Sequence, residues 1–132
     1  MNDLSRVLIV DDRREYLDAL ARALKLSFDV MTATSVDEAQ SLLAEKPRVM
    51  LALVDICLKD TEDPSDRSGL TLIQWIAQHY ESTPIVAMSA LDDPLLPEAT
   101  REAGACRFLR KPVRLDDLRE IVAELAGDQA GQ

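Results

Sequence analysis

The chain has 132 residues, a length that fits one domain of ordinary size and leaves no room for a second. Its hydrophobic content of 47% is enough to fill one core and too high for a disordered chain. The formal net charge of −9 argues against nucleic-acid binding, because phosphate backbones are bound by clustered Lys and Arg. No stretch approaches the ~20 apolar residues that a membrane span needs, so we expect no membrane association.

The N-terminal segment and the cysteines predict a cytoplasmic protein. Residues 1–6 are polar overall, and the apolar run that follows, Val7 to Val10, is too short for a signal peptide. Cys57 and Cys106 both fall in segments that we expect to be buried or nearly so. Without a signal peptide, we expect reduced thiols and no disulfide.

In the first half of the chain, short apolar runs alternate with segments whose apolar residues recur at helical spacing. Residues 6–10 form an apolar run that ends in two aspartates, which indicates a strand buried on both faces. Apolar residues recur at helical spacing over 16–24, and residues 28–33 are rich in β-forming types. Ser35 and Glu38 have the spacing of a capping box for a helix that Pro47 ends.

The second half repeats this alternation. The expected elements are a strand at 49–54 followed directly by Asp55, a helix over 70–80, a strand at 84–88, a helix from about Pro97 to Gly104, a strand at 106–109, a helix over 115–125 and a tail from Gly127. Five strand–helix alternations imply right-handed crossovers, a parallel sheet and helices on both of its faces. The sequence therefore predicts a doubly wound (βα)5 protein of the α/β class.

Polar residues follow the predicted strands at the edge where ligands bind in open α/β sheets. They are Asp11, Asp12, Asp55, Ser89 and Lys111. Carboxylates that meet there repel one another, at about 4 kcal/mol for two unit charges ~4 Å apart with an effective dielectric of ~20. A Mg²⁺ ion with oxygen ligands and the lysine ammonium would offset this repulsion. The set suits in-line phosphoryl transfer, with Asp55 as the natural acceptor.

Asp11-Asp12, Asp55, Ser89-Ala90 and Lys111-Pro112, in this order and at these strand ends, resemble the receiver domain of two-component response regulators. Each pair alone is a weak signal, but their joint occurrence is specific, and the resemblance covers about residues 5–126. It implies a flavodoxin-like, CheY-like sheet with strand order 2-1-3-4-5. It also implies a single receiver domain over residues 1–132, with no output domain and no enzymatic activity beyond its own phosphorylation and dephosphorylation.

Carried over to this sequence, the resemblance implies that Asp55 accepts a phosphoryl group from a phosphohistidine. The donor would be a sensor histidine kinase or a phosphotransfer protein. Mg²⁺ would be bound by Asp12 directly, by Asp11 through water, by Asp55 and by the backbone carbonyl of Cys57.

The resemblance also assigns roles at the other strand ends. Lys111 would pair with the phosphoryl group, and Ser89 would hydrogen-bond to it after transfer. Phe108 occupies the family's aromatic switch position. A downstream protein would then bind the face made by the fourth helix, the fifth strand and the fifth helix, and a homodimer is a further option.

The segment after Asp55 departs from the family pattern. The family commonly has Leu-Pro a few residues beyond the acceptor, but here Leu58 is followed by Lys59, and the first glycine is Gly69. Residues 59–68 therefore indicate an insertion rich in acidic and hydroxyl side chains. Two explanations stay open: a solvated acidic loop, or a lid or partner-docking element.

Two other functions stay open as well. The chain could be a receiver-like binding module that signals without phosphorylation. It could also be a phosphatase with an aspartyl nucleophile, although haloacid-dehalogenase-like enzymes need Asp-x-Asp on the first strand and this pair is adjacent. Each site residue also has a simpler structural role: a helix cap for Asp11 or Asp12, a turn for Asp55 and Ser89, a solvated loop for Lys111, and the core for Phe108.

Overall fold

The computed structural model describes residues 5–59, 63 and 65–130, with side chains described up to residue 125. A five-stranded parallel sheet has the strand order β2-β1-β3-β4-β5, as predicted. The strands are β1 (Arg6–Val10), β2 (Asp29–Ala33), β3 (Leu51–Asp55), β4 (Ile85–Ser89) and β5 (Arg107–Arg110). The helices are α1 (Arg14–Leu24), α2 (Val36–Glu45), α3 (Ser68–His79), α4 (Leu96–Ala103) and α5 (Leu115–Ala130).

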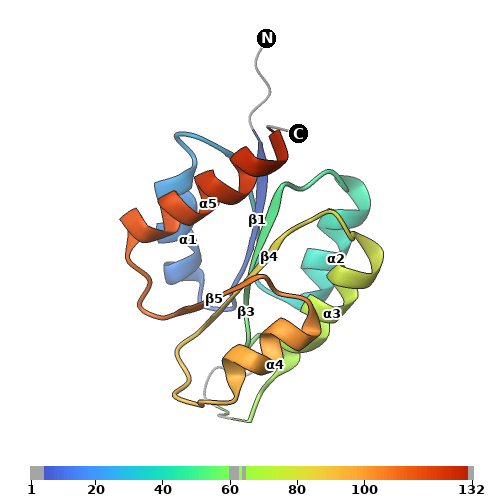
Figure 1. The fold of residues 1–132 in the computed structure, drawn as a ribbon, viewed down its shortest axis with the longest axis vertical. Coiled ribbons are helices and arrows are strands. Elements are labelled where there is room, and N and C mark those ends of the chain that lie inside the picture. Colours follow the sequence, from blue (N-terminus) through green and yellow to red (C-terminus); the bar gives the residue numbers. More distant parts are fainter. Residues whose placement is uncertain (1–4, 60–62, 64, 131–132) are drawn as a thin grey trace.

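Helices cover both faces of the sheet, α1 and α5 on one side and α2, α3 and α4 on the other (Figure 1). Successive side chains of a strand point to opposite faces, so alternate residues of β3 fill different cores. Leu51 and Leu53 pack with α1 and α5, whereas Ala52 and Val54 pack with the other three helices. Every residue of β3 and β4 is buried, which explains why their sequences are continuous apolar runs up to the polar last residue of each strand.

The predicted helix boundaries at Ser35 and Gly104 are confirmed. Ser35 is the N-cap of α2, and its Oγ accepts a hydrogen bond of 3.1 Å from the amide of Glu38. The carboxylate of Glu38 accepts from the amide of Thr34 (2.6 Å), one residue earlier than a regular capping box would have it. Gly104 ends α4 with φ of +127°, a backbone conformation that favours glycine.

Three details of the sequence-based prediction are wrong. α5 continues to Ala130, although a tail was expected from Gly127; a glycine inside a helix costs only ~1 kcal/mol. β3 begins at Leu51 rather than at residue 49, and it includes Asp55. Cys106 is exposed, because it precedes the edge strand β5, whereas Cys57 is buried; both are free thiols.

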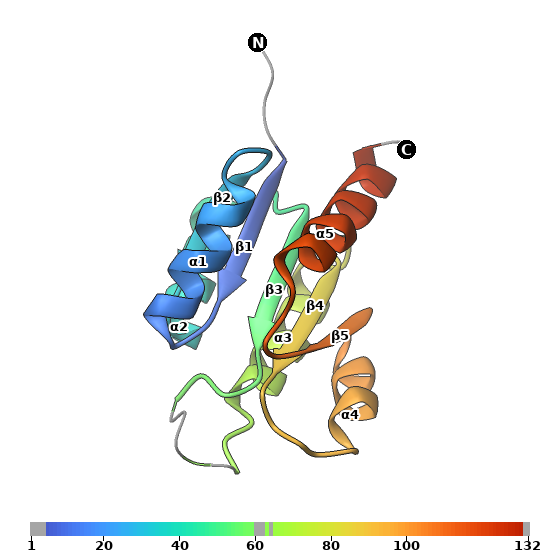
Figure 2. The same cartoon turned by 90° about the vertical axis from the view of Figure 1, so that its left-hand side faces the viewer.

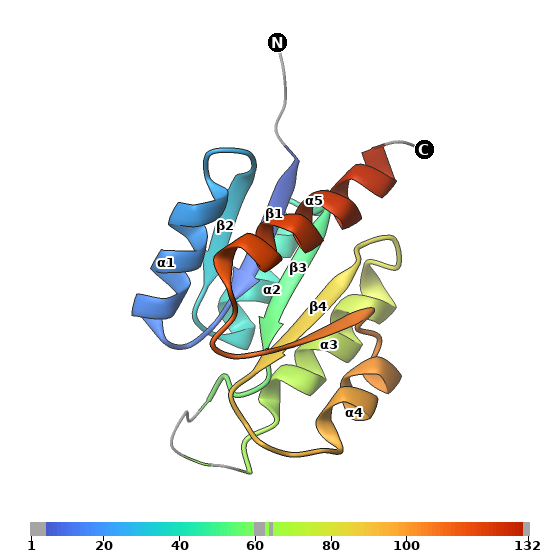
Figure 3. The same cartoon turned by 60° about the vertical axis from the view of Figure 1, so that its left-hand side comes forward.

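The loops that follow the strands gather at one end of the sheet. Figure 2 shows the connections after β1, β3 and β4 at the end opposite to the one where β1 begins and α5 finishes. Figure 3 shows the loops after β1 and β3 next to each other, and the orange segment of β5 running back toward them before α5 begins. In the described part of the chain, no helix has the length and apolar character needed to cross a membrane.

Candidate functional site

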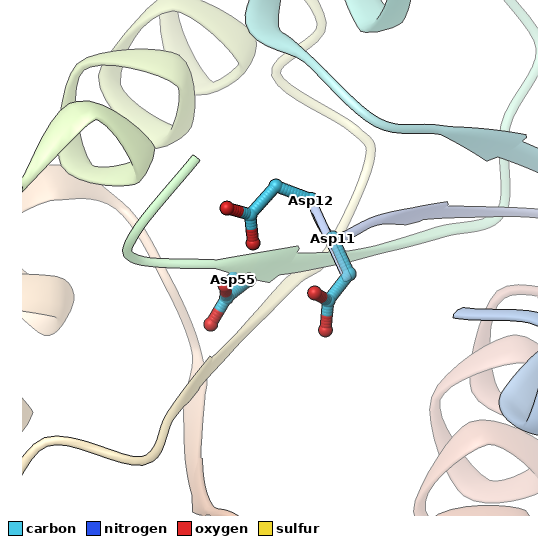
Figure 4. Close-up of side chains that lie close together, drawn as sticks. All are labelled: Asp11, Asp12 and Asp55. Carbon is cyan, nitrogen blue, oxygen red and sulfur yellow. The ribbon is translucent and has the colours of Figure 1, made fainter. Parts of the chain in front are cut away.

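Three carboxylates meet at this end of the sheet. Asp11 and Asp12 directly follow β1, and Asp55 is the last residue of the neighbouring β3 (Figure 4). The register pairs Val10 with Val54, so the residues that follow are brought side by side. One oxygen from each carboxylate lies within 4.8 Å of those of the other two. Asp11 is fully buried and Asp55 is 5% exposed, so solvent screens their repulsion poorly.

Lys111 supplies a cation to this cluster from the end of β5. Its Nζ lies 2.6 Å from Oδ2 of Asp11 and 3.3 Å from Oδ1 of Asp55, and its side chain is only 10% exposed. The Lys111 amide donates to the carbonyl of Ser89 (2.9 Å), which joins the loop after β5 to the end of β4. The structure therefore brings together Asp11, Asp12, Asp55 and Lys111, as the sequence predicts.

Burial and charge act in opposite directions on Asp55. Burial raises the pKa of its carboxyl to about 7, and the nearby carboxylates of Asp11 and Asp12 act in the same direction, whereas Lys111 opposes them. Burial by itself would lower the pKa of Lys111, but the attraction of Asp55 and Asp11 outweighs it and the pKa is raised. The lysine therefore stays charged, whereas the Asp55 carboxyl has its pKa close to neutral pH.

A cavity of about 300 Å³ opens above Asp55. Its lining includes Arg13, Tyr16, Asp55, Cys57, Leu91 and Lys111. The walls contributed by Tyr16 and Leu91 are apolar, and the charged groups lie at Asp55, Lys111 and Arg13. A cavity with a few convergent polar groups and a perturbed carboxyl is the expected form of a reactive site.

Tyr16 is a site residue that sequence analysis missed. Its ring lies under the Lys111 ammonium, with Nζ 4.4 Å from the ring centroid. Its hydroxyl accepts a hydrogen bond of 3.2 Å from the amide of Val113. In the sequence it belongs to the apolar stripe of the first helix; its place four residues after Asp12 is the one signal that could have linked it to this edge.

Ser89, Phe108 and Cys57 occupy the predicted positions, with specific contacts. Ser89 is 1% exposed, and its Oγ accepts from the amide of Leu91 (3.0 Å), as in a turn. Phe108 is half-buried and packs against the core beneath α2, α3 and α4. The thiol of Cys57 donates to the carbonyl of Asp66 (3.3 Å), and burial together with Asp55 raises its pKa to about 11. That pKa makes the thiol a poor nucleophile.

The described ends of the predicted insertion are held by hydrogen bonds around Asp66. One Asp66 oxygen accepts from the amide of Lys59 (2.8 Å) and the other from the amide of Ser68 (2.9 Å). Arg67 forms an ion pair of 3.1 Å with Asp93, which connects this segment to the loop after β4. Residues 60–62 and 64 lie outside the described part of the chain, so the lid or docking role of residues 59–68 stays a prediction.

Asp11 also serves a structural role, although it is not the cap of α1. Its Oδ1 accepts from the amide of Arg13 (2.9 Å), and Arg13 itself is the N-cap residue. Both oxygens of Asp11 are therefore engaged, one by Arg13 and one by Lys111. The donor set of three clustered carboxylates fits a hard divalent cation such as Mg²⁺, which prefers oxygen ligands.

The sequence and the fold match known proteins over nearly the whole chain. The family described as the response regulator receiver domain matches residues 7–123. The response regulator protein PilR of Pseudomonas aeruginosa is 39% identical over 119 residues, covering 89% of this chain and 25% of that protein. The hydrogenase transcriptional regulatory protein HoxA of Cupriavidus necator is 32% identical over 130 residues, covering 96% of this chain and 25% of that protein. The chain thus spans about a quarter of the length of these relatives.

A solved structure gives the same result. The CheY-like response regulator receiver domain protein of Methanospirillum hungatei has a TM-score of 0.84 and 27% identity, and the match covers 98% of both chains. Receiver domains are signalling modules of two-component systems that are phosphorylated on an aspartate and bind Mg²⁺ in an acidic pocket. From its fold, its clustered carboxylates and these matches, this chain belongs to the response regulator receiver domain family.

Proposed function

We propose that this chain accepts a phosphoryl group on Asp55 from the phosphohistidine of a sensor histidine kinase or a phosphotransfer protein. The observation that carries the proposal is the bridge formed by Lys111 between Asp11 and Asp55 beside the carboxylate cluster. A solvated loop lysine would have no reason to be nine-tenths buried between two carboxylates. An ammonium held there can pair with phosphoryl oxygens on the acceptor.

Mg²⁺ would be bound by Asp12, Asp55 and the backbone carbonyl of Cys57, and by Asp11 through water. The engagement of both Asp11 oxygens by Arg13 and Lys111 supports an indirect role for Asp11. When bound, the ion supplies positive charge that offsets the carboxylates and the incoming phosphoryl oxygens.

The chain's own residues would carry the transfer. A carboxylate oxygen of Asp55 attacks phosphorus in line, the P–N bond to the donor imidazole breaks, and its electron pair stays on the imidazole nitrogen. Lys111 pairs with one phosphoryl oxygen. The Ser89 hydroxyl gives up its hydrogen bond with the amide of Leu91, rotates about χ1 and donates to a second phosphoryl oxygen.

The signal would pass through protein contacts. In this proposal Phe108 rotates inward when the Ser89 hydroxyl moves toward the phosphoryl group, and the face formed by α4, β5 and α5 binds a downstream protein or a second copy of the chain. A phosphorelay, in which Asp55 passes the phosphoryl group to another histidine, is the other route. The proposal also includes a cytoplasmic location.

Acetyl phosphate with Mg²⁺, followed by intact mass spectrometry, tests the central claim. We expect one phosphoryl adduct on the wild-type chain, none on Asp55→Ala, and an unchanged adduct on the control Asp18→Ala, which removes an exposed carboxylate from α1. An adduct that persists on Asp55→Ala contradicts the choice of acceptor. Absence of any adduct favours the binding module, and many cycles of phosphate-monoester hydrolysis favour the phosphatase.

A further inference from the structure

We propose that Tyr16 is a positioning residue that holds Lys111 at the acceptor site. The inference rests on the proposed function of Asp55 and adds a residue to it. Tyr16 does not need to touch the phosphoryl group, because it acts through the lysine.

Two contacts of Tyr16 reach the same short segment. The ring face lies 4.4 Å from Nζ of Lys111, and the hydroxyl accepts from the amide of Val113 at 3.2 Å. A ring face carries negative potential and attracts a cation, most strongly where water is largely excluded. One side chain therefore holds both the ammonium and the loop that carries it.

The position of Tyr16 in the fold gives this contact a consequence for the site. Tyr16 lies in the first turn of α1, directly after the loop that carries Asp11 and Asp12. Lys111 directly follows β5, the edge strand of the sheet, and lies 100 residues along the chain from Asp11. The start of α1 thus positions both the carboxylates and the cation that faces them.

Without the ring, the flexible lysine would keep only its carboxylate partners. Nζ is closer to Asp11 (2.6 Å) than to Asp55 (3.3 Å), and Asp11 is fully buried. A lysine drawn further toward Asp11 would pair less well with phosphoryl oxygens on Asp55. The ring adds a third attraction, 4.4 Å from Nζ, and this limits how far the ammonium can move.

Substitutions at position 16 separate the ring from the hydroxyl. With acetyl phosphate at saturating Mg²⁺, we expect Tyr16→Leu to slow phosphorylation of Asp55 about fivefold, the size of a partly desolvated cation–π contact. Tyr16→Phe keeps the ring, and we expect its rate to stay within about twofold of wild type. The matched control is Tyr80→Leu, the same substitution at the other tyrosine, which caps α3 and contacts Trp75.

A graded series tests the electrostatic origin of the effect. Phenylalanine carrying increasing numbers of fluorine atoms at position 16 keeps the ring shape and weakens its negative face. The rate should fall stepwise with fluorination, whereas a role in packing alone predicts no trend. This series also decides the matter if Tyr16→Leu does not fold.

The outcomes distinguish this inference from the proposed function. Rates for Tyr16→Phe as low as for Tyr16→Leu, or a flat fluorination series, would overturn the role of the ring. If the wild-type chain takes no phosphoryl group, the proposed function fails first. The contact is then tested by urea unfolding of Tyr16→Leu, Lys111→Met and the double variant without metal, where additive effects would refute the contact.

Discussion

Asp55 is buried in a position that penalises its own ionisation. Its side chain lies among two further carboxylates, and Lys111 is shared between Asp55 and Asp11. Burial is the larger effect, so the pKa of Asp55 is about 7, compared with 3.8 for an exposed aspartate. A group that destabilises the fold when charged is typical of reactive sites, where function and stability conflict.

The pH dependence of stability follows from this shift. Between about pH 4 and pH 7 the folded protein binds a proton on Asp55 that the unfolded chain has lost, so stability falls as pH rises through this window. The raised pKa of Lys111 adds stability that is constant below its ordinary value of 10.5 and is lost only above that pH, outside this range. We expect Asp55→Asn to be about 1–3 kcal/mol more stable than wild type at pH 8 in EDTA, and its pH profile to be flatter.

Urea unfolding at several pH values measures this difference. Asp18→Asn, which removes an exposed carboxylate of α1, is the matched control and should follow the wild-type profile. A wild-type stability that rises from pH 5 to pH 8 relative to Asp55→Asn would show that the carboxylate is not penalised.

At the scale of elements, α3 begins so close to the end of β3 that position 69 has no room for a side chain. Gly69 lies at the start of α3, and its amide donates to the carbonyl of Ile56 (2.7 Å). A Cβ at this position would overlap the carbonyl oxygen of Asp55 and lie 2.6 Å from Cα of Ile56. The first glycine after the acceptor is therefore needed because α3 begins against the backbone of Asp55.

Gly69→Ala should accordingly disturb both the fold and the site. We expect a loss of about 3 kcal/mol in the free energy of unfolding, because backbone atoms cannot move aside as a flexible side chain can. The phosphorylation rate of Asp55 should fall as well, since its carbonyl must shift. Thr71→Ala, on the exposed face of the same helix, is the control and should change stability by less than ~0.5 kcal/mol. A loss below ~1 kcal/mol for Gly69→Ala would show that the helix moves away freely.

For the whole molecule, the two cores and the charged edge have separate roles. The apolar clusters on either face of the sheet supply stability, and each draws on alternate residues of the same strands. The carboxyl edge instead concentrates negative charge in a protein whose formal net charge is already −9. A divalent cation bound at that edge should therefore stabilise the entire fold.

Thermal unfolding with increasing Mg²⁺ tests this expectation. At a concentration 100 times Kd the gain is about 2.7 kcal/mol, which corresponds to roughly 10 °C in Tm for a domain of this size. Asp12→Asn should lose most of the gain, whereas Asp18→Asn should keep it. An equal Mg²⁺ response in both variants would indicate general screening of charge and no specific site.

Much of the architecture could be predicted from the sequence, because the relevant patterns are local. Continuous apolar runs mark strands buried on both faces, helical spacing marks the covering helices, and Ser35 and Gly104 mark helix ends. Once the strands are known to be parallel, Asp12, Asp55 and Lys111 must lie at one edge. That rule, together with the family resemblance, was enough to predict the carboxylates and the lysine.

Tertiary structure alone decided how these groups contact one another. The direction of each side chain depends on register, on neighbouring loops and on packing from segments far apart in the sequence. For this reason the sequence could not place the ring of Tyr16 under Lys111, pair Arg67 with Asp93 or leave Cys106 exposed. Periodicity along the chain determines which residues reach the carboxyl edge of the sheet, and three-dimensional packing determines which of them touch.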